Sequence, residues 1–255
     1  MKHNDRMNYM HKNFVCDQWL SQIMNRDAYR LTIDDNFSRE VSAFKSIDYL
    51  QLPQPQSRSI FIYTKVPVLS TNLIKFITKI GFNLVDTNVV FEKPMLINEE
   101  FTNNSKCSVR FALSEDKNQV AELARNCFTY SRFHLDDDIP LSLANKIKAE
   151  WARNYFIGLR GDKMIVALVG DVIVGFLLLL ESDTNLIIDL FAVDNNYQRI
   201  GVASDMIAYA ECYLNSFSSV QVGTQLANIP SIRLYEKMGF RVCTSNYVFH
   251  YHKTC

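Results

Sequence analysis

A predicted strand that leads through a polar turn into a glycine at the start of a helix constrains this chain more than any other feature. Residues 187–193 (IIDLFAV) are apolar and partly β-branched, which predicts a strand, and residues 194–197 predict a turn. Apolar residues then recur at helical spacing from Val202 to Tyr213. Because the first N–H groups of a helix lack partners within it and the helix dipole is positive there, this order favours an anion at the turn.

Six residues form the predicted phosphate turn, and their spacing narrows the range of ligands. A glycine and, two positions later, an alanine let the backbone approach an oxygen atom closely. The spacing differs from the G-x-x-x-x-G-K-[ST] loop, and no G-x-G-x-x-G motif opens a helix elsewhere in the chain, which argues against nucleoside triphosphates and NAD. The six residues are Gln198, Arg199, Ile200, Gly201, Val202 and Ala203.

A second motif further along the chain completes a known pattern. Residues 228–240 read NIPSIRLYEKMGF. Together with the turn at residues 198–203 they resemble the GNAT N-acyltransferases, whose pyrophosphate loop reads Q/R-x-x-G-x-G/A and whose following helix commonly reads L-Y-x-K-x-G-F. The resemblance implies the GNAT fold, an α/β (α+β) architecture in which helices flank a central, mixed and twisted sheet. It also implies a transferase that uses a coenzyme A thioester, either acetyl-CoA or a longer donor such as 3-hydroxybutyryl-CoA.

The resemblance further implies which residues act. In the family, a bulge in the strand before the turn separates it from its neighbour and leaves backbone N–H groups for the thioester oxygen, which by position falls near residues 191–193. Tyr235 matches the family's general acid, and a tyrosine with a pKa of about 10 stays protonated at neutral pH, so it can donate to the departing thiolate. Besides the phosphate turn, the implied coenzyme contacts are Phe191, Ala192, Val193, Asn228, Ser231 and Tyr235.

The sequence does not define the base that deprotonates the amine. Asp189 in the predicted coenzyme strand and Glu92 at the end of an N-terminal strand are candidates, as are His134 and Asp136 in an aromatic and acidic loop. Each could instead be an ordinary capping or hydrogen-bonding residue, and the amine could lose its proton through ordered water. No metal site is expected, because the six cysteines are scattered without a C-x-x-C motif or a companion histidine pair.

Within this superfamily the chain is most similar to the bacterial dTDP-fucosamine N-acetyltransferases. The similarity rests on residues 85–92 (VDTNVVFE), 131–136 (SRFHLD), 151–156 (WARNYF) and 160–162 (RGD). It implies a dTDP-linked amino-dideoxy sugar as acceptor, acylated on its C3 or C4 amine for surface polysaccharide synthesis. An arginine could meet the diphosphate in a bidentate manner, and tyrosines could stack on the pyrimidine. The predicted substrate contacts are Tyr130, Arg132, His134, Asp136 and Tyr155.

Two domains are predicted, residues 1–104 and residues 105–255, of which the second carries the motifs described above. Residues 74–82 (IKFITKIGF) align with residues 232–240 (IRLYEKMGF), with a lysine, a glycine and a phenylalanine in common. We interpret the N-terminal domain as a degenerate half of the GNAT fold that serves as scaffold or substrate wall.

Composition limits the partners of the protein. Lys plus Arg and Asp plus Glu are 27 each, so the net charge is zero and the composition gives no excess of positive charge for binding nucleic acid. The most apolar stretch, residues 164–180, is interrupted by Gly170 and Asp171, which predicts a hairpin with a type I′ turn and not a membrane span. We expect a cytoplasmic protein without membrane or nucleic-acid partners. A homodimer formed by the C-terminal β-rich run is one expectation, and pairing of that run within the chain is the alternative.

Two other functions are compatible with the sequence. A peptide or small-amine N-acetyltransferase would share the coenzyme half, but it would leave the N-terminal domain unexplained. A non-catalytic coenzyme-binding module would not need Tyr235, whereas the glycine, asparagine and tyrosine of both motifs are present.

Overall fold

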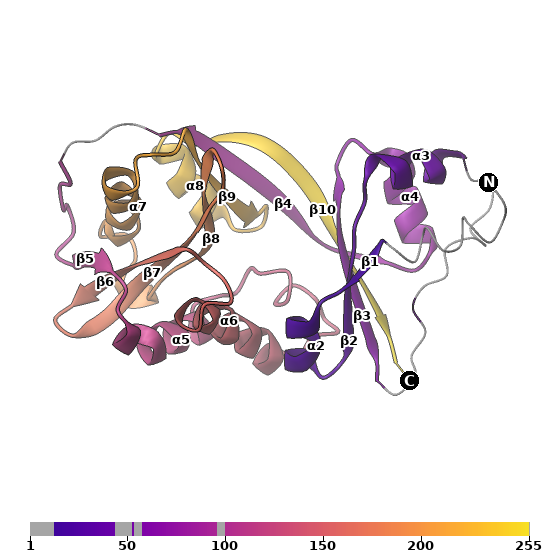
Figure 1. Ribbon diagram of the computed structural model, residues 1–255, viewed down its shortest axis with the longest axis horizontal. Coiled ribbons are helices and arrows are strands. Elements are labelled where there is room, and N and C mark those ends of the chain that lie inside the picture. The colour runs from indigo at the N-terminus through magenta and orange to yellow at the C-terminus, as the bar shows by residue number, and fades with distance from the viewer. Residues whose placement is uncertain (1–12, 44–52, 54–57, 96–99, 255) are drawn as a thin grey trace. The chain divides into compact units, whose positions relative to one another are not determined.

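A computed structural model describes residues 13–43, 53, 58–95 and 100–254 of the chain (Figure 1). Contacts between residues divide the chain into two compact units that interleave along the sequence. This division differs from the continuous boundary predicted between residues 104 and 105. Unit 1 comprises Met1–Asn88, Leu135–Asp138 and Ser245–Cys255, and unit 2 comprises Val89–His134 and Ile139–Thr244.

The described strands form one mixed sheet, and helices lie between them along the chain. The strands are β1 (Phe14–Cys16), β2 (Asp27–Leu31), β3 (Ile60–Pro67), β4 (Asn83–Pro94), β5 (Ser108–Phe111), β6 (Lys163–Val169), β7 (Val172–Glu181), β8 (Asn185–Val193), β9 (Ser219–Gln225) and β10 (Arg241–Lys253). The α-helices are α2 (Gln18–Met24), α3 (Asp35–Ala43), α4 (Thr71–Lys79), α5 (Lys117–Asn126), α6 (Leu141–Phe156), α7 (Val202–Tyr213) and α8 (Ile229–Lys237), with short 3-10 turns at Ser114–Asp116 and Asn195–Tyr197. The strand order is β1-β2-β3-β10-β4-β9-β8-β7-β6-β5.

Two segments of the chain repeat the same strand–helix–strand order. They are β3-α4-β4 and β9-α8-β10, and after each helix comes a glycine in the left-handed region, Gly81 with φ of 97° and Gly239 with φ of 87°. In the sheet, β10 lies beside β3 and β4 lies beside β9, so each repeat pairs its first strand with the last strand of the other. This exchange of strands explains why the compact units interleave along the sequence. The order of elements agrees with the predicted half-GNAT repeat.

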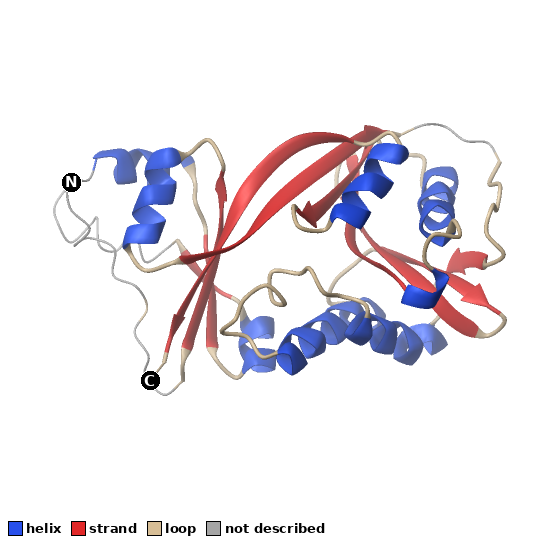
Figure 2. Ribbon diagram, turned by 180° about the vertical axis from the view of Figure 1, so that it is seen from behind, coloured by secondary structure: helices blue, strands red, loops and turns tan. Residues whose placement is uncertain are grey.

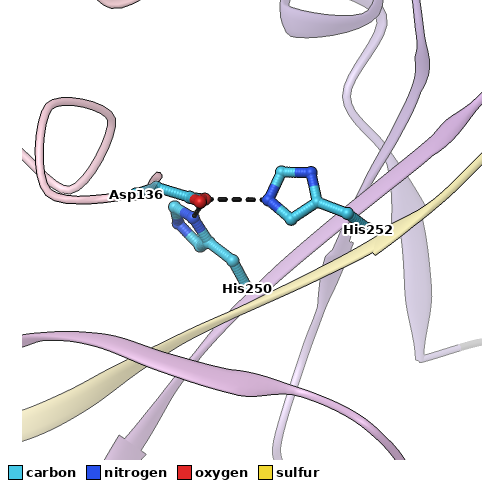
Figure 3. Close-up of side chains that lie close together, drawn as sticks. All are labelled: Asp136, His250 and His252. Atoms are coloured by element: carbon cyan, nitrogen blue, oxygen red, sulfur yellow. Dashed lines mark hydrogen bonds and ion pairs between the residues drawn. The ribbon is translucent and has the colours of Figure 1, made fainter. Parts of the chain in front are cut away.

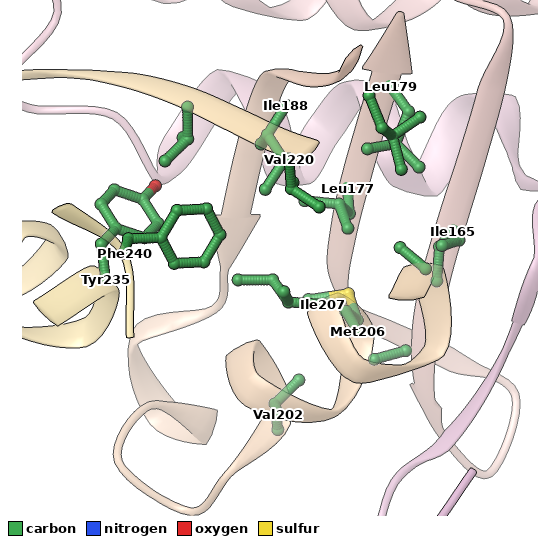
Figure 4. Packing of buried hydrophobic residues seen from close by; sticks show 14 of the residues in the cluster. Ile165, Leu177, Leu179, Ile188, Val202, Met206, Ile207, Val220, Tyr235 and Phe240 are labelled. Atoms are coloured by element: carbon green, nitrogen blue, oxygen red, sulfur yellow. The ribbon is translucent and has the colours of Figure 1, made fainter. Parts of the chain in front are cut away.

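Unit 2 has helices on both faces of its part of the sheet (Figures 1 and 2). Alternate residues of neighbouring strands point to opposite faces, which gives the sheet two buried sides. Ile165 and Leu177 pack in one core cluster with Met206 of α7, as Figure 4 shows, whereas Met164 and Leu178 belong to a second cluster that includes residues of α5 and α6. The predicted arrangement of a mixed sheet flanked by helices is confirmed.

The apolar stretch at residues 164–180 forms the hairpin of β6 and β7. Val169 pairs with Val172, so the connecting loop has two residues. Gly170 has a φ of 59°, whereas Asp171 is not among the residues with positive φ. The predicted type I′ turn is therefore wrong, because that type needs positive φ at both central residues, and a glycine in the first position alone is typical of type II′. Among the described residues, no helix combines the length and apolar character needed to cross a membrane.

Unit 1 has a core of its own. Phe37 of α3 and Phe76 of α4 make an edge-to-face contact with ring centroids 6.2 Å apart. Both pack in a cluster with Ile62 of β3 and Phe249 of β10, which are buried. The C-terminal part of β10 pairs antiparallel with β3, from Asn246–Pro67 to Lys253–Ile60. The C-terminal β-rich run is thus paired within the chain, as one of the two sequence-based alternatives predicts.

Candidate active site

Strands β8 and β9 separate at the point where the glycine turn begins. Their parallel ladder ends at the pair formed by Ile188 and Val222, and β8 continues to its end as a partner of β7. Ile188 and Leu190 pair with consecutive residues of β7, so Asp189 is the extra residue of a β-bulge. The predicted bulge is therefore present, but it lies at Asp189 and not within residues 191–193. Those three residues lie on the diverging part of β8, where the described ladder gives the backbone no partner in β9.

The turn between β8 and α7 has an unusual backbone. Gly201 caps the helix with a φ of 100°, and Arg199 also has a positive φ, 66°. Non-glycine residues rarely adopt this conformation, so the turn is tightly constrained. Gln198 donates its side-chain amide to the carbonyl oxygen of Val193 at 3.1 Å and to Asn195 Oδ1 at 2.9 Å. The side chain of Gln198 thus ties the turn to the end of β8, and the twelve-residue helix α7 places its positive end at this turn.

A buried carboxylate on the first turn of α7 is a feature that the sequence analysis missed. Asp205 is fully buried and accepts the backbone N–H of Ser105 at 2.6 Å and that of Asn104 at 3.2 Å. A Cβ atom built on Gly201 would have Ser105 as its nearest neighbour, at 3.7 Å. The polar segment before β5 is therefore fixed to the start of the helix. The acidic residue in the first turn of the helix was the available signal.

Tyr235 lies on α8 and reaches into the core of unit 2. Only 3% of its surface is exposed, and its ring packs against Phe91 with centroids 5.8 Å apart. The ring of Phe240 lies 5.7 Å from it, as Figure 4 shows. Burial raises the pKa of Tyr235 above its ordinary value, and a hydrogen bond with the side chain of Ser231 acts in the opposite direction. The phenol is thus protonated at neutral pH, as a general acid must be. Its role in catalysis stays a prediction.

Asn228 caps α8. Its side-chain oxygen accepts the backbone N–H of Ser231 at 3.4 Å, and its amide donates to Thr224 Oγ1 at 3.3 Å. Capping of this kind satisfies a helix N–H group that otherwise has no partner. The structure thus assigns Asn228 a structural role, while the predicted contacts of Asn228 and Ser231 with the coenzyme stay predictions.

The two acidic candidates for the base both have hydrogen-bond partners. Asp189 accepts the indole N–H of Trp151 at 2.8 Å, and Arg160 donates to both of its oxygens at 2.7 Å and 2.5 Å. A carboxylate held by both donors of a guanidinium would have to give up charge-assisted hydrogen bonds to accept a proton. This favours an anchoring role for Asp189. Glu92 Oε1 lies 2.7 Å from the hydroxyl of Ser219. For both residues the role of base stays a prediction.

Lys148 on α6 is a candidate that the sequence analysis missed. It is buried, with 8% of its surface exposed, and its ammonium group lies 4.8 Å from the ring centroid of Phe128 and 4.9 Å from that of Trp151. Burial, together with the charges of Arg132 and Arg160, lowers the pKa of Lys148 to about 7, against the opposing effect of Asp189. A lysine on a helix face gave no signal in the sequence, because its burial depends on side chains outside the helix, such as Phe128, as well as on Trp151.

Two predicted substrate residues, Arg132 and His134, adjoin this lysine. The guanidinium carbon of Arg132 lies 4.4 Å from the ring of Phe133, and its charge acts on Lys148. His134 Nε2 lies 2.9 Å from Asn145 Oδ1, and its Nδ1 lies 2.5 Å from the Ser131 hydroxyl. Burial lowers the pKa of His134, the Asn145 hydrogen bond raises it, and Lys148 lowers it. His134 therefore favours the neutral form, with Nε2–H donating to Asn145.

The two predicted aromatic contacts differ in burial. Tyr130 is 39% exposed. Tyr155 is half-buried, which raises its pKa, and it makes an edge-to-face contact with Phe156 at 5.1 Å. Stacking of either ring on a base stays a prediction.

Asp136 belongs to unit 1 and accepts hydrogen bonds from two histidines of β10 (Figure 3). Its Oδ2 lies 2.5 Å from His250 Nδ1 and 2.8 Å from His252 Nε2. The two histidines share a face because they are two residues apart on a strand. Arg26 Nη1 lies 2.9 Å from His252 Nδ1, and because a guanidinium only donates, this nitrogen accepts and His252 Nε2 carries the proton. The carboxylate is thus an anchor of unit 1, and its predicted roles in substrate binding and as a base stay predictions.

This cluster has the composition of a metal site, although none was expected from the sequence. One carboxylate oxygen and two imidazole nitrogens lie within 4.8 Å of one another, and all three residues belong to unit 1. A metal ion needs the lone pair of His252 Nε2, but the contact with Arg26 leaves that nitrogen protonated. The observed geometry is therefore that of a hydrogen-bonded network, and metal binding would require Arg26 to move away from the imidazole.

Replacement of Asp136 by asparagine or alanine is expected to destabilise the protein at neutral pH, by about 2–5 kcal/mol for alanine, because two buried N–H groups lose their acceptor. Burial raises the pKa of Asp136, but the hydrogen bonds and charges of His250 and His252 lower it more, so the net shift is downward. The contribution of Asp136 is therefore complete above its unfolded pKa of about 4 and is lost as pH falls below that value.

Urea unfolding of the wild type and Asp136→Asn at a series of pH values measures this effect. The stability difference should be constant near neutrality and should shrink below about pH 4. Asp137→Asn removes an exposed carboxylate from the adjacent position and is the matched control. Equal stability of the wild type and Asp136→Asn at pH 7 would contradict the anchoring role.

Comparison with known proteins identifies the class to which this site belongs. Residues 118–240 match the family described as Acetyltransferase (GNAT) family. This range contains β6 to β9, the glycine turn and Tyr235. Just under half of the chain is therefore similar to the GNAT acetyltransferases, a superfamily whose members use acyl-CoA. The superfamily predicted from the two motifs is thus confirmed for this part of the chain.

About half of the chain is also similar to a protein of polysaccharide biosynthesis. The spore coat polysaccharide biosynthesis protein SpsD of Bacillus subtilis is 36% identical over 137 residues, which are 53% of this chain and 47% of SpsD. The match therefore spans about half of each protein.

Solved structures share the fold at low sequence identity. A functionally unknown conserved protein from Staphylococcus epidermidis has a TM-score of 0.59 at 17% identity, and the match covers 88% of this chain and 83% of that chain. A tandem GNAT protein from the clavulanic acid biosynthesis pathway has a TM-score of 0.54 at 9% identity, covering 88% and 75%. A GCN5-related N-acetyltransferase from Sphaerobacter thermophilus has a TM-score of 0.55 at 14% identity, covering 79% and 62%. These matches extend beyond residues 118–240 and confirm the GNAT fold with a GNAT-like N-terminal region.

Proposed function

We propose that this protein is an acyl-CoA-dependent N-acyltransferase whose acceptor is the amine of a nucleotide-linked amino-dideoxy sugar. One observation carries the first part of the proposal. The bulge at Asp189 and the end of the β8–β9 ladder at Ile188 leave the backbone of residues 189–193 without a partner in β9, immediately before the glycine turn. Backbone N–H groups at such a divergence suit the oxyanion of acyl transfer, and the positive end of α7 suits a pyrophosphate.

Each residue of the proposed site has a defined task in the reaction. The thioester supplies an activated acyl group, so that a C–N bond forms to the amine as the C–S bond breaks. Tyr235 gives its phenolic proton to the sulfur that leaves with the electron pair, and it recovers a proton from solvent. The proton that the amine nitrogen loses passes to solvent or to a base. The turn at Gly201 holds the pyrophosphate, which fixes the reacting carbonyl beside β8.

The acceptor is proposed from two observations. SpsD is described as a protein of spore coat polysaccharide biosynthesis, and polysaccharides are assembled from nucleotide-linked sugars. In addition, Arg132, Lys148 and Arg160 lie with the ring of Trp151 in one cluster of unit 2. Guanidinium and ammonium groups bind phosphate, and an aromatic face stacks on a base or a sugar ring. A dTDP-linked sugar offers both partners.

Release of free thiol from acetyl-CoA with a panel of dTDP- and UDP-linked 3-amino and 4-amino dideoxy sugars tests this function. We expect rapid turnover with one dTDP-linked amino sugar and none with the corresponding hydroxyl sugar, which lacks the nucleophile. The same panel with 3-hydroxybutyryl-CoA identifies the acyl group.

Lack of turnover with every sugar, while coenzyme A still binds, would contradict the acceptor. Turnover with a lysine-containing peptide instead would establish the alternative, a peptide N-acetyltransferase. Coenzyme binding without turnover of any amine would indicate a non-catalytic module.

A further inference from the structure

Lys148 carries a largely buried ammonium group to which the described residues offer no hydrogen-bond acceptor, although its nitrogen is not wholly shielded from solvent. Only 8% of the residue is exposed, and its nitrogen takes part in none of the hydrogen bonds and ion pairs found among the described residues. The rings of Phe128 and Trp151 lie against it instead. Ring faces attract a cation but accept no conventional hydrogen bonds, so they do not replace the water that the ammonium loses on burial.

The charged groups around Lys148 do not neutralise the positive charge of its ammonium group. Arg132 and Arg160 are cationic, and Asp189 is the carboxylate that acts on this lysine. Asp189, however, is held by Arg160 through both oxygens and by the indole of Trp151. Positive charge therefore predominates beside a polar group that lacks a partner. An arrangement of this kind is expected where a ligand supplies the missing anion.

We propose that Lys148 binds a phosphate group of the acceptor's nucleotide diphosphate, with Trp151 beside the ligand. This inference rests on the proposed function for the identity of the acceptor, whereas the need for an anion follows from Lys148 itself. A phosphate offers several acceptor oxygens to an ammonium that has three N–H donors. Arg132, which is half-buried, is near enough to act on Lys148 and supplies a second cation. Lys148 would thus contribute to acceptor affinity and not to the chemical step.

The binding should depend on pH in a defined direction. The free lysine has a pKa lowered to about 7 by burial and by Arg132 and Arg160, against the opposing effect of Asp189, and neutral His134 also faces it. An anion favours the protonated form and therefore raises the pKa of Lys148 when it binds. Affinity should be greatest below pH 7 and should fall as pH rises above 7, and binding near pH 7 should take up protons.

Trp151 provides a direct measurement of binding. The chain has two tryptophans, so Trp19→Phe leaves Trp151 as the only one. In this background, inorganic pyrophosphate and dTDP are titrated while the tryptophan fluorescence is recorded. Saturating coenzyme A is present throughout, so that the turn at Gly201 is already filled. We expect saturable changes in fluorescence with both probes. The absence of any change in fluorescence would overturn the proposal.

Lys148→Met in the same background tests the role of the ammonium. We expect it to weaken the binding of dTDP and pyrophosphate by about 10- to 100-fold, the usual effect of removing a charged hydrogen bond, and to abolish the dependence on pH between 6 and 8. The KM for acetyl-CoA should not change. Lys146→Met removes an exposed lysine from the same helix and should bind both probes like the parent.

Thermal unfolding separates this ligand-binding role from a structural one. Methionine replaces a buried cation without a partner, so Lys148→Met should be more stable than the parent although it binds the anion less tightly. A variant that is folded and binds dTDP with unchanged affinity would overturn the proposal, whatever the enzyme acylates. Conversely, anion binding that depends on Lys148 without turnover of any amino sugar would uphold the site and contradict the proposed function.

Discussion

Tyr235→Phe is expected to lower kcat by about 100- to 10,000-fold, the usual contribution of a general acid, while the dissociation constant of coenzyme A stays close to that of the wild type. The substitution removes one oxygen from a ring that is 3% exposed and packed between Phe91 and Phe240, so the core should be preserved. What is lost is the proton donor for the leaving thiolate and the hydrogen bond with Ser231.

The pH dependence of the wild type should agree with this role. Burial raises the pKa of Tyr235 above its ordinary value, so the acid stays protonated throughout the neutral range, and kcat should not fall through loss of this proton below about pH 10. Steady-state thiol release with the acceptor identified in the sugar panel gives kcat and KM for both proteins. An unchanged kcat in Tyr235→Phe would remove this residue from the mechanism.

Tyr209→Phe is the matched control. Tyr209 lies on α7, burial also raises its pKa, and its ring packs against Phe111 and Tyr213. Tyr209 is thus also a packed tyrosine with a raised pKa, although it is less deeply buried than Tyr235, and it belongs to neither motif. A loss of kcat confined to Tyr235→Phe would separate acid catalysis from packing of a phenol.

Gly201→Ala is expected to weaken the binding of coenzyme A by about 10- to 100-fold, the equivalent of one or two charge-assisted hydrogen bonds. The added Cβ would meet Ser105 at an ordinary contact distance of 3.7 Å, so crowding is not the cause. The cause is the backbone, because a φ of 100° is strained for any residue with a side chain. Relief of the strain would turn the N–H groups of the phosphate turn away from the positions that the helix start defines.

Gly170→Ala controls for backbone strain. Gly170 also has a positive φ, 59°, and a Cβ there would have no neighbour within 4 Å, but it lies in the β6–β7 turn, far along the chain from the phosphate turn. Both variants should lose about 1 kcal/mol of stability or slightly more. Isothermal titration with coenzyme A should show weaker binding for Gly201→Ala alone. Equal affinity in all three proteins would contradict the assignment of this turn.

Local features of the fold could be predicted from the sequence because they depend on neighbouring residues. Apolar spacing predicted the helix that became α7 and the family motif predicted the helix that became α8, and a glycine marks the start of the first and the end of the second. The family resemblance placed a bulge near residues 191–193, but the structure has it at Asp189. The difference arises because the register of β8 is set by its pairing with β7, which the sequence of β8 alone does not contain.

Residues whose role depends on distant partners were missed or interpreted differently. Lys148 looked like any lysine on a helix, and its burial is produced by Phe128, Trp151 and their neighbours. Asp136 looked like part of an acidic substrate loop, whereas its carboxylate accepts hydrogen bonds from His250 and His252, more than one hundred positions later in the chain. Neither contact leaves a pattern in the local sequence.

The sequence by itself determined the family match of residues 118–240 and the positions of the glycine turn and Tyr235, because a glycine turn at a helix start and an amphipathic helix are specified by consecutive residues. The tertiary structure alone decided that β4 and β10 exchange places between the two repeats and that Lys148 is left without an acceptor. Strand pairing and burial are settled by contacts between distant segments, each of which is compatible with several partners until the whole chain has packed.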